Sequence, residues 1–108
     1  MQIPDRDQIF RAFADPTRRA LFERLCQDGA QTVHALTEGA KISQPAVSKH
    51  LAVLKAAGLV QGQVQGRETH YTAQPKALAP LTDWLSFYTG FWEQKLDGLG
   101  DLLKRMDQ

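Results

Sequence analysis

The chain has 108 residues and a formal net charge of +1, and 43% of its residues are hydrophobic. This length and composition fit one folded domain with one core and exclude a disordered chain. The charge is unevenly distributed, because residues 41–71 carry an excess of three positive charges while the segments on either side are slightly acidic. A local basic excess of this kind is typical of a segment that meets nucleic acid.

The cysteine content and the absence of targeting signals indicate the compartment. Cys26 is the single cysteine, so no internal disulfide can form, which fits a reducing environment. The N-terminus lacks a basic run followed by an apolar core, and no stretch approaches the roughly 18 apolar residues of a membrane span. We therefore expect a cytoplasmic protein without membrane insertion. Cys26 is expected to pack as a small apolar residue, with a redox-active thiol as the alternative.

Two helices are predicted in the first part of the chain. The first covers residues 5–13 and has Phe10 on its apolar side. The second begins after Asp15 and runs to about Cys26, because an aspartate N-cap followed by a proline in the first turn favours a helix start. Two arginines in this first turn are interpreted as exposed charges, with a phosphate contact as the alternative: Arg18 and Arg19.

A helix-turn-helix is predicted over about residues 32–57. Thr32 can cap a short helix that ends near Gly39, and a tight connection leads to a longer helix over residues 43–57. Ser43 is a good N-cap for that longer helix, and Gly58 follows its last residue. Two short helices joined by a tight turn containing glycine are the helix-turn-helix pattern, whose second helix reads the DNA.

The predicted reading helix has two different faces. Apolar residues at helical spacing form one stripe that we expect to be buried: Val47, Leu51 and Leu54. The opposite face carries short side chains and lysines and has no acidic residue. Such a face can approach phosphates closely and enter a major groove. A plain solvent-exposed amphipathic helix is the alternative interpretation.

A β-hairpin is predicted over about residues 59–73. The hydrophobic pattern changes from helical to alternating after Gly58, and Gln65-Gly66 reads as the turn. A hairpin directly behind a reading helix is a wing, and Arg67 at its tip is placed to reach a minor groove or flanking phosphates. A hairpin without a ligand is the alternative.

A long final helix is predicted over about residues 76–106. Its apolar residues alternate in steps of three and four, which is a heptad seam. A helix of this length would be about 45 Å long and would carry more apolar surface than the rest of the chain can cover. We expect a second copy to cover it, with packing inside one chain as the alternative. The predicted dimer-interface residues are Phe10, Leu81, Leu85, Tyr88, Trp92, Leu99 and Leu102. The fold class is thus mostly α with a small β-hairpin, in the order α-α-α-α-β-β-α.

Two motifs carry a resemblance to a known family. They are Ala14-Asp15-Pro16-Thr17-Arg18-Arg19 and Ser43-Gln44-Pro45-Ala46-Val47-Ser48-Lys49-His50-Leu51, the latter followed by Ala57-Gly58-Leu59-Val60. At this spacing the chain resembles, over nearly its whole length, the ArsR/SmtB family of bacterial winged helix-turn-helix repressors. The resemblance implies a homodimer paired through the first and last helices. It also implies binding to an inverted-repeat operator and release when an effector arrives.

The chain departs from the metal-sensing members of that family. Arsenic, cadmium and zinc sensors carry a Cys-x-Cys pattern in the third helix or a His/Asp cluster in the last helix. Here the third helix has no cysteine and the last helix no histidine, and the histidines lie on three different elements: His34, His50 and His70. Trp84-Leu85 with Phe91-Trp92-Glu93 instead resembles the metal-independent branch. We therefore expect no metal and no cofactor, and release by an effector or a partner protein.

The reading helix and the hairpin supply the candidate DNA contacts. Gln44 can pair bidentately with adenine, and Ala46 can touch a thymine methyl group. Ser43 is interpreted mainly as a cap, and His50 as a flank of the buried stripe with a phosphate contact as a further option. The full set of predicted DNA-binding residues is Ser43, Gln44, Pro45, Ala46, Ser48, Lys49, His50, Lys55 and Arg67.

Two classes of function remain open at this point. The sequence has no glycine-rich phosphate loop and no nucleophile beside a base at a recognisable spacing, so we do not expect an enzyme. The first hypothesis is a repressor that binds double-stranded DNA. The alternative is a winged-helix module that binds another protein and no DNA, such as an anti-repressor or an assembly subunit. The basic segment and the acid-free reading helix favour the first hypothesis.

Overall fold

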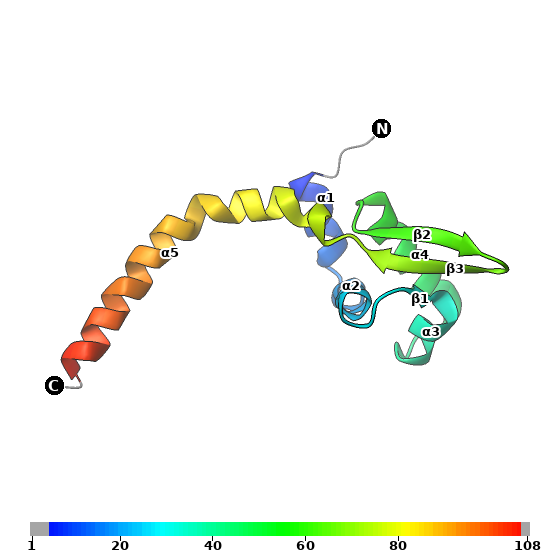
Figure 1. Ribbon diagram of the computed structural model, residues 1–108, viewed down its shortest axis with the longest axis horizontal. Helices are drawn as coiled ribbons and strands as arrows, with labels where there is room; N and C mark the ends of the chain where they lie inside the picture. Colours follow the sequence, from blue (N-terminus) through cyan, green and yellow to red (C-terminus); the bar gives the residue numbers. More distant parts are fainter. Residues whose placement is uncertain (1–4, 107–108) are drawn as a thin grey trace.

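The computed structural model describes residues 5–106, apart from the side chain of Leu99 (Figure 1). The helices are α1 (Arg6–Phe13), α2 (Pro16–Asp28), α3 (Val33–Glu38), α4 (Gln44–Ala56) and α5 (Ala79–Met106). The strands are β1 (Gln31–Thr32), β2 (Val60–Gln65) and β3 (Glu68–Ala73), and a 3₁₀ turn, η1 (Pro75–Leu78), leads into α5. The expected α-helical body with a β-hairpin is confirmed, with one strand more than the sequence predicted.

The hydrophobic core joins the first four helices to the start of the hairpin. The largest fully buried side chains are those of Ile9, Leu36, Val47, Leu51, Leu54 and Leu59. Three of them are the stripe of α4 that the spacing of apolar residues predicted. Since one whole side of α4 is buried against α2 and α3, its other side is held facing outward.

Side-chain caps set the helix starts at the predicted positions. Asp15 accepts hydrogen bonds from the backbone N–H groups of Thr17 and Arg18 at 2.7 and 3.2 Å. The Thr32 hydroxyl accepts from the Ala35 N–H at 3.1 Å, and the Ser43 hydroxyl accepts from the Ala46 N–H at 3.3 Å. These bonds satisfy backbone donors that have no partner inside the helix. At the other end of α4, Gly58 has a φ of 76°, a left-handed conformation that glycine adopts without a steric penalty.

The sheet has three antiparallel strands in the order β1-β3-β2. The hairpin pairs Val60 with Ala73 at its base and Gln65 with Glu68 at its tip, where Gly66 has a φ of 66°. Strand β1 adds two pairs, Gln31 with Tyr71 and Thr32 with His70. The sequence did not reveal β1, because two residues are too few for an alternating pattern.

Helix α5 projects away from the body along the longest axis of the molecule (Figure 1). Its first turns pack on α1, where the rings of Phe10 and Trp84 meet at 5.2 Å between centroids. The molecule measures 64 × 33 × 21 Å and its radius of gyration is 18.5 Å, well above the roughly 13 Å expected for a compact chain of this length. Large apolar side chains are exposed along α5, including Leu85, Tyr88, Trp92 and Leu102. Among residues 5–106, no helix has the length and apolar character that a membrane span requires.

Three details of the sequence interpretation change. Cys26 is exposed, so the prediction that it packs as an apolar residue is wrong, because its position on α2 faces outward. The segment after Gln74 begins as the 3₁₀ turn η1, and the α-helix proper starts at Ala79. The side chain of Leu99, which the heptad seam included, lies outside the part of the chain that the structure describes.

Candidate nucleic-acid interface

The outward face of α4 presents the residues that the sequence singled out. Gln44, Pro45, Ser48 and Lys49 are exposed, whereas Ala46 is half-buried at the edge of the packed side. Ser43 is also exposed, but its hydroxyl is occupied by the helix cap. The N-terminal half of α4 therefore offers short polar side chains around one glutamine, a shape that can enter a major groove.

Several exposed cations lie on or near this face. Lys41, Lys49, Lys55 and Arg67 are all exposed, and α4 contains no carboxylate. Lys41 lies in the turn between α3 and α4 with a φ of 58°, a region that residues other than glycine rarely adopt. Lys55 is in the last turn of α4, about 16 Å along the helix axis from Gln44. Lys55 thus lies at the opposite end of α4 from Gln44.

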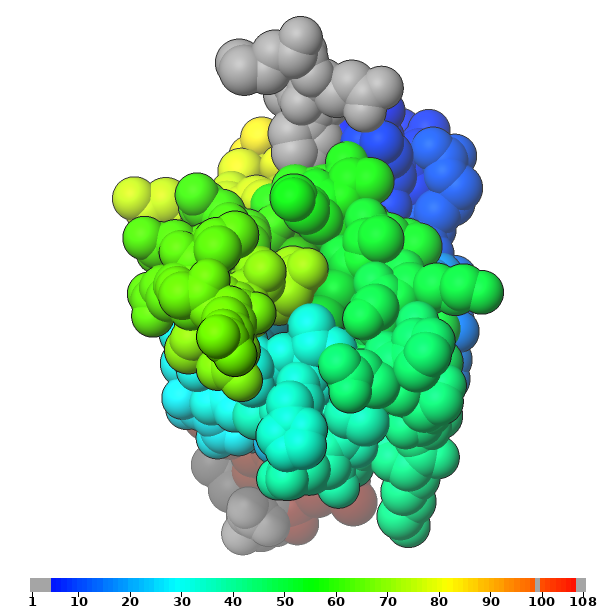
Figure 2. Space-filling model, turned by 90° about the vertical axis from the view of Figure 1, so that its right-hand side faces the viewer, coloured from blue at the N-terminus to red at the C-terminus, as the bar shows by residue number. Residues whose placement is uncertain are grey.

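The hairpin and the N-terminal half of α4 lie on the same end of the molecule. Figure 2 views this end, with α3, α4 and the β2–β3 hairpin side by side and the C-terminal end of α5 behind them. Gln44 of α4 and Arg67 of the hairpin line one hollow of about 210 Å³, together with His34 and Glu68. The structure therefore brings together the two residues to which the sequence assigned base reading and wing contact.

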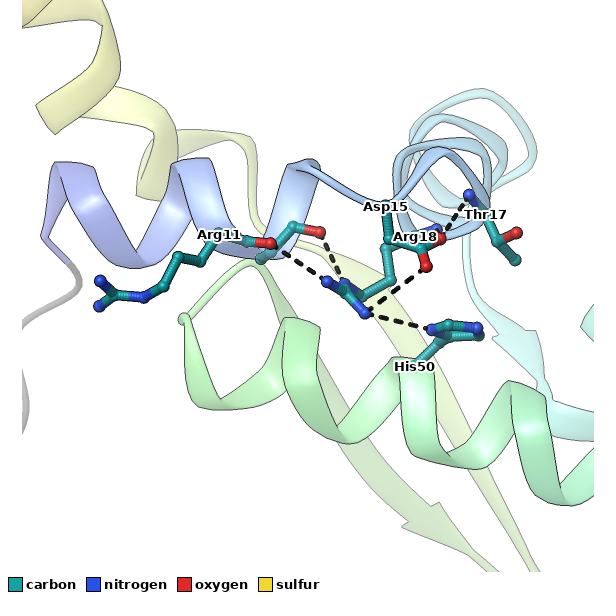
Figure 3. A network of polar contacts seen from close by, with 6 residues as sticks. Arg11, Asp15, Thr17, Arg18 and His50 are labelled. Atoms are coloured by element: carbon teal, nitrogen blue, oxygen red, sulfur yellow. Dashed lines mark hydrogen bonds and ion pairs between the residues drawn. The ribbon is translucent and has the colours of Figure 1, made fainter.

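A half-buried arginine, Arg18, links the reading helix to the N-terminal helices (Figure 3). Arg18 Nε donates to the Ala12 carbonyl at 2.7 Å, and Arg18 Nη2 donates to the Arg11 carbonyl at 3.1 Å. Arg18 Nη1 lies 3.5 Å from Nδ1 of His50 and 3.9 Å from Oδ2 of Asp15. The prediction that Arg18 is an exposed charge is wrong, since only 19% of its side chain is exposed. Arg19, its neighbour, is exposed as predicted.

The sequence motif contains Arg18, but residue patterns alone could not predict its contact with His50. Arg18 falls within the motif around Asp15-Pro16, but its partners are backbone carbonyls of α1 and a histidine 32 positions later. His50 was assigned to the flank of the buried stripe, and its half-buried ring indeed lies there. The contact between the two side chains depends on the packing of α2 against α4.

The carboxyl of Asp15 is held ionised at the centre of this cluster. Partial burial of the carboxyl acts to raise its pKa, whereas backbone hydrogen bonds from Arg18 and Thr17 lower it. The charge of His50, when its ring is protonated, and that of Arg18 lower the pKa further, and these effects together place it below the ordinary value of 3.8. Asp15 therefore stays negative over the whole neutral and mildly acidic range.

This leads to a prediction about acid stability. We expect Asp15→Asn to lower the free energy of unfolding at pH 7, because asparagine keeps the cap but removes the charge. In the wild type, the ionised Asp15 contributes to the free energy of unfolding above pH 3.8. This contribution is lost as the pH falls through the lower pKa that Asp15 has in the folded state. Urea unfolding at pH 7 and pH 3, at one protein concentration, measures this effect. Between these pH values Asp15→Asn should lose less free energy of unfolding than the wild type. An equal loss in both proteins would contradict this role.

The chain is similar to known DNA-binding regulators. A helix-turn-helix domain family matches residues 13–63, from the end of α1 to β2. The transcriptional regulator Rv2034 of Mycobacterium tuberculosis is 40% identical over 97 residues, covering 90% of this chain and 87% of that protein. The transcriptional repressor SmtB of the same species is 40% identical over 74 residues, covering 68% of this chain and 54% of that protein. The crystal structure of the ArsR family transcriptional regulator RHA00566 superposes with a TM-score of 0.71 at 32% identity, covering 81% of this chain and 89% of that chain.

The chain belongs to the ArsR/SmtB family of transcriptional regulators. The resemblance stated from the two sequence motifs is thereby confirmed. As a member of this family, the protein is a DNA-binding transcriptional regulator with a winged helix-turn-helix fold. The alternative of a winged-helix module that binds only protein is not favoured by these relatives.

Proposed function

We propose that the protein is a repressor that binds an inverted-repeat operator as a homodimer. In this proposal, α4 of each copy enters the major groove and the β2–β3 hairpin contacts the flanking backbone. The observation that carries it is that Gln44 and Arg67 line one hollow beside a reading helix that has no carboxylate. The protein acts by binding and not by catalysis, and it works in the cytoplasm, where bacterial operators lie.

The dimer in this proposal is held by α5. The exposed apolar residues Leu85, Tyr88, Trp92 and Leu102 follow the predicted seam, and Leu81 packs against the core at the start of the helix. Contiguous apolar surface of this extent is typical of an interface between proteins. The same helix of a second copy covers it with matching residues, as a two-fold axis requires. Phe10 lies at the base of this surface, where it meets Trp84.

The effector in this proposal is a small molecule or a partner protein and not a metal. The third helix offers no cysteine, and His34 lies at the surface 3.2 Å from Glu38. Within residues 5–106, no group of three or more His, Cys, Asp or Glu side chains is arranged to hold a metal ion. Adding zinc, cadmium or arsenite to the protein–operator complex tests this point, and release by any of them would contradict it.

Gln44 is the proposed base-reading residue. We expect Gln44→Ala to weaken operator binding by about 5- to 150-fold and to relax the preference for one base pair, since a bidentate pair is worth about 1–3 kcal/mol. Titration of duplexes that carry each base pair at that position measures both effects. The matched control is Gln94→Ala on α5, which projects away from the hairpin (Figure 1). Unchanged affinity and preference in Gln44→Ala would contradict the assignment.

Arg67 is the proposed wing contact. We expect Arg67→Ala to weaken binding to all duplexes alike and to reduce the slope of log affinity against log salt by about 0.9, the amount for one phosphate. Binding titrations at several salt concentrations give the slope for the wild type and the variant. Arg105→Ala, which removes the same charge near the far end of α5, serves as control. If Arg67→Ala keeps the wild-type slope, the hairpin does not touch the DNA.

Footprinting of the purified protein on the region upstream of its own gene tests the proposal as a whole. We expect protection of two half-sites related by inversion, with centres about 34 Å apart, one turn of the duplex. Candidate effectors are then added to find the one that removes the footprint. If no duplex is retarded or protected at low salt, the interaction-module alternative replaces the repressor.

A further inference from the structure

Arg18 contacts both α1, which packs against the dimerisation helix, and α4, the reading helix. On one side is α1, whose Phe10 packs on Trp84 at the base of the dimerisation helix. On the other side is α4, the reading helix, which carries His50. The guanidinium of Arg18 reaches both, as Figure 3 shows. It binds the last carbonyls of α1 through Nε and Nη2 and lies 3.5 Å from the His50 ring through Nη1.

We infer that Arg18 is a positioning residue that fixes the angle of α4 relative to α1. Since α1 carries the dimerisation helix, this angle sets the distance and orientation between the two reading helices of a dimer. Arg18 would then determine which half-site spacing the protein accepts, without touching the DNA. The inference rests on the proposed dimeric repressor and deepens it, because it names a determinant of operator geometry outside the DNA-contacting face.

The chemistry of the contact explains why an arginine is needed at this position. A guanidinium is a rigid planar fork that donates in several directions at once, whereas the single nitrogen of lysine cannot reach all of these acceptors. The Arg11 carbonyl also accepts from the Ala14 N–H at 3.3 Å, so Arg18 adds a second hydrogen bond there, and its Nε donates to the Ala12 carbonyl. A largely buried cation also needs compensation, which comes from these carbonyls and from Asp15 Oδ2 at 3.9 Å.

Hydrogen bonds hold the residues from which the Arg18 side chain extends. Asp15 is fixed by its hydrogen bonds from the Thr17 and Arg18 N–H groups, and the Arg18 backbone belongs to the first turn of α2. From this position on α2, the Arg18 side chain contacts both α1 and α4. Nη1 lies 3.9 Å from Asp15 Oδ2 and 3.5 Å from His50 Nδ1, so it contacts α4 in addition to the N-cap of α2. The orientation of Nη1 toward His50 Nδ1 is the feature that distinguishes positioning from capping.

A double-mutant cycle on the full chain tests the inference. The variants are Arg18→Lys, His50→Leu and both together, and each is titrated with three duplexes. One duplex is the full operator, the second is the operator with two base pairs inserted between the half-sites, and the third is an unrelated sequence. Sedimentation establishes that each variant is still a dimer, and thermal unfolding establishes that it is folded at the assay temperature.

We expect Arg18→Lys to reduce the preference for the operator over the respaced duplex by roughly tenfold, while affinity for the unrelated duplex stays within about twofold. His50→Leu should reduce the same preference, and the double variant should lose no more than either single one, because both remove one contact. If His50 instead contributes only a phosphate contact, His50→Leu weakens all three duplexes alike. That result would overturn the inference. So would a double variant whose loss of preference equals the product of the losses in the two single variants.

The same experiment distinguishes failure of this inference from failure of the proposed dimeric repressor. A wild-type protein that does not distinguish the operator from the respaced duplex overturns both. A wild-type protein that does distinguish them, together with an Arg18→Lys variant of unchanged preference and a lower melting temperature, overturns the positioning role alone. In that case Arg18 is a cap of α1 and nothing more.

Discussion

Replacing Trp92 with glutamate is expected to abolish operator binding without altering any DNA contact. Trp92 is 60% exposed on the part of α5 that projects beyond α1, and its ring packs edge-on against Phe91 at 6.3 Å between centroids. In the proposed dimer this ring lies in the seam, where a carboxylate would be buried without a partner at a cost of several kcal/mol. Each copy alone has only the few basic residues near α4 and the hairpin, so we expect its affinity for one half-site to be poor.

The measurement for Trp92→Glu is sedimentation combined with operator titration at one protein concentration. We expect a monomer, or a chain that no longer folds because its apolar helix lacks a partner. The matched control is Gln94→Glu, which adds the same carboxylate to an exposed position about 200° further round α5, away from the seam. A Trp92→Glu protein that remains a dimer and binds the operator normally would remove α5 from the interface.

Truncating Leu51 to alanine is the substitution with the largest expected effect on folding. Leu51 is fully buried in the stripe of α4, where it joins the core made by α1, α2, α3 and the start of the hairpin. Leucine-to-alanine changes at such sites cost about 2–5 kcal/mol, because they lose buried apolar surface and leave a cavity. This is a large share of the roughly 5–15 kcal/mol that stabilises a typical domain.

Urea unfolding at fixed protein concentration measures this loss, since the stability of a dimer depends on concentration. The control is Val53→Ala on the same helix, where the side chain is 41% exposed and we expect a change of at most about 0.5 kcal/mol. Equal destabilisation by the two substitutions would mean that α4 does not pack as the structure shows.

The features that the sequence predicted correctly are those with a local physical cause. Asp15, Thr32 and Ser43 cap their helices because a short polar side chain can reach the free N–H groups of the next turn. The stripe of α4 follows from helical spacing, and the glycine turn of the hairpin follows from the need for a positive φ at Gly66. These signals need no knowledge of the rest of the fold.

The features that the sequence missed depend on contacts between distant segments. Strand β1 is too short to carry a pattern, and it forms only because β3 offers it an edge next to Tyr71. Arg18 looked like an exposed charge because its partners, the α1 carbonyls and His50, are brought to it by helix packing. Cys26 was expected inside because cysteine is usually buried, but its position on α2 faces outward.

The most direct test of the dimeric repressor is sedimentation of the wild-type protein at micromolar concentration, alone and with one full operator duplex. A dimer of the 12.1 kDa chain has a mass of about 24 kDa, and we expect that species both free and as two chains on one operator. A well-folded monomer that binds a full operator tightly as a single chain would contradict the role assigned to α5 and, with it, the inverted-repeat operator.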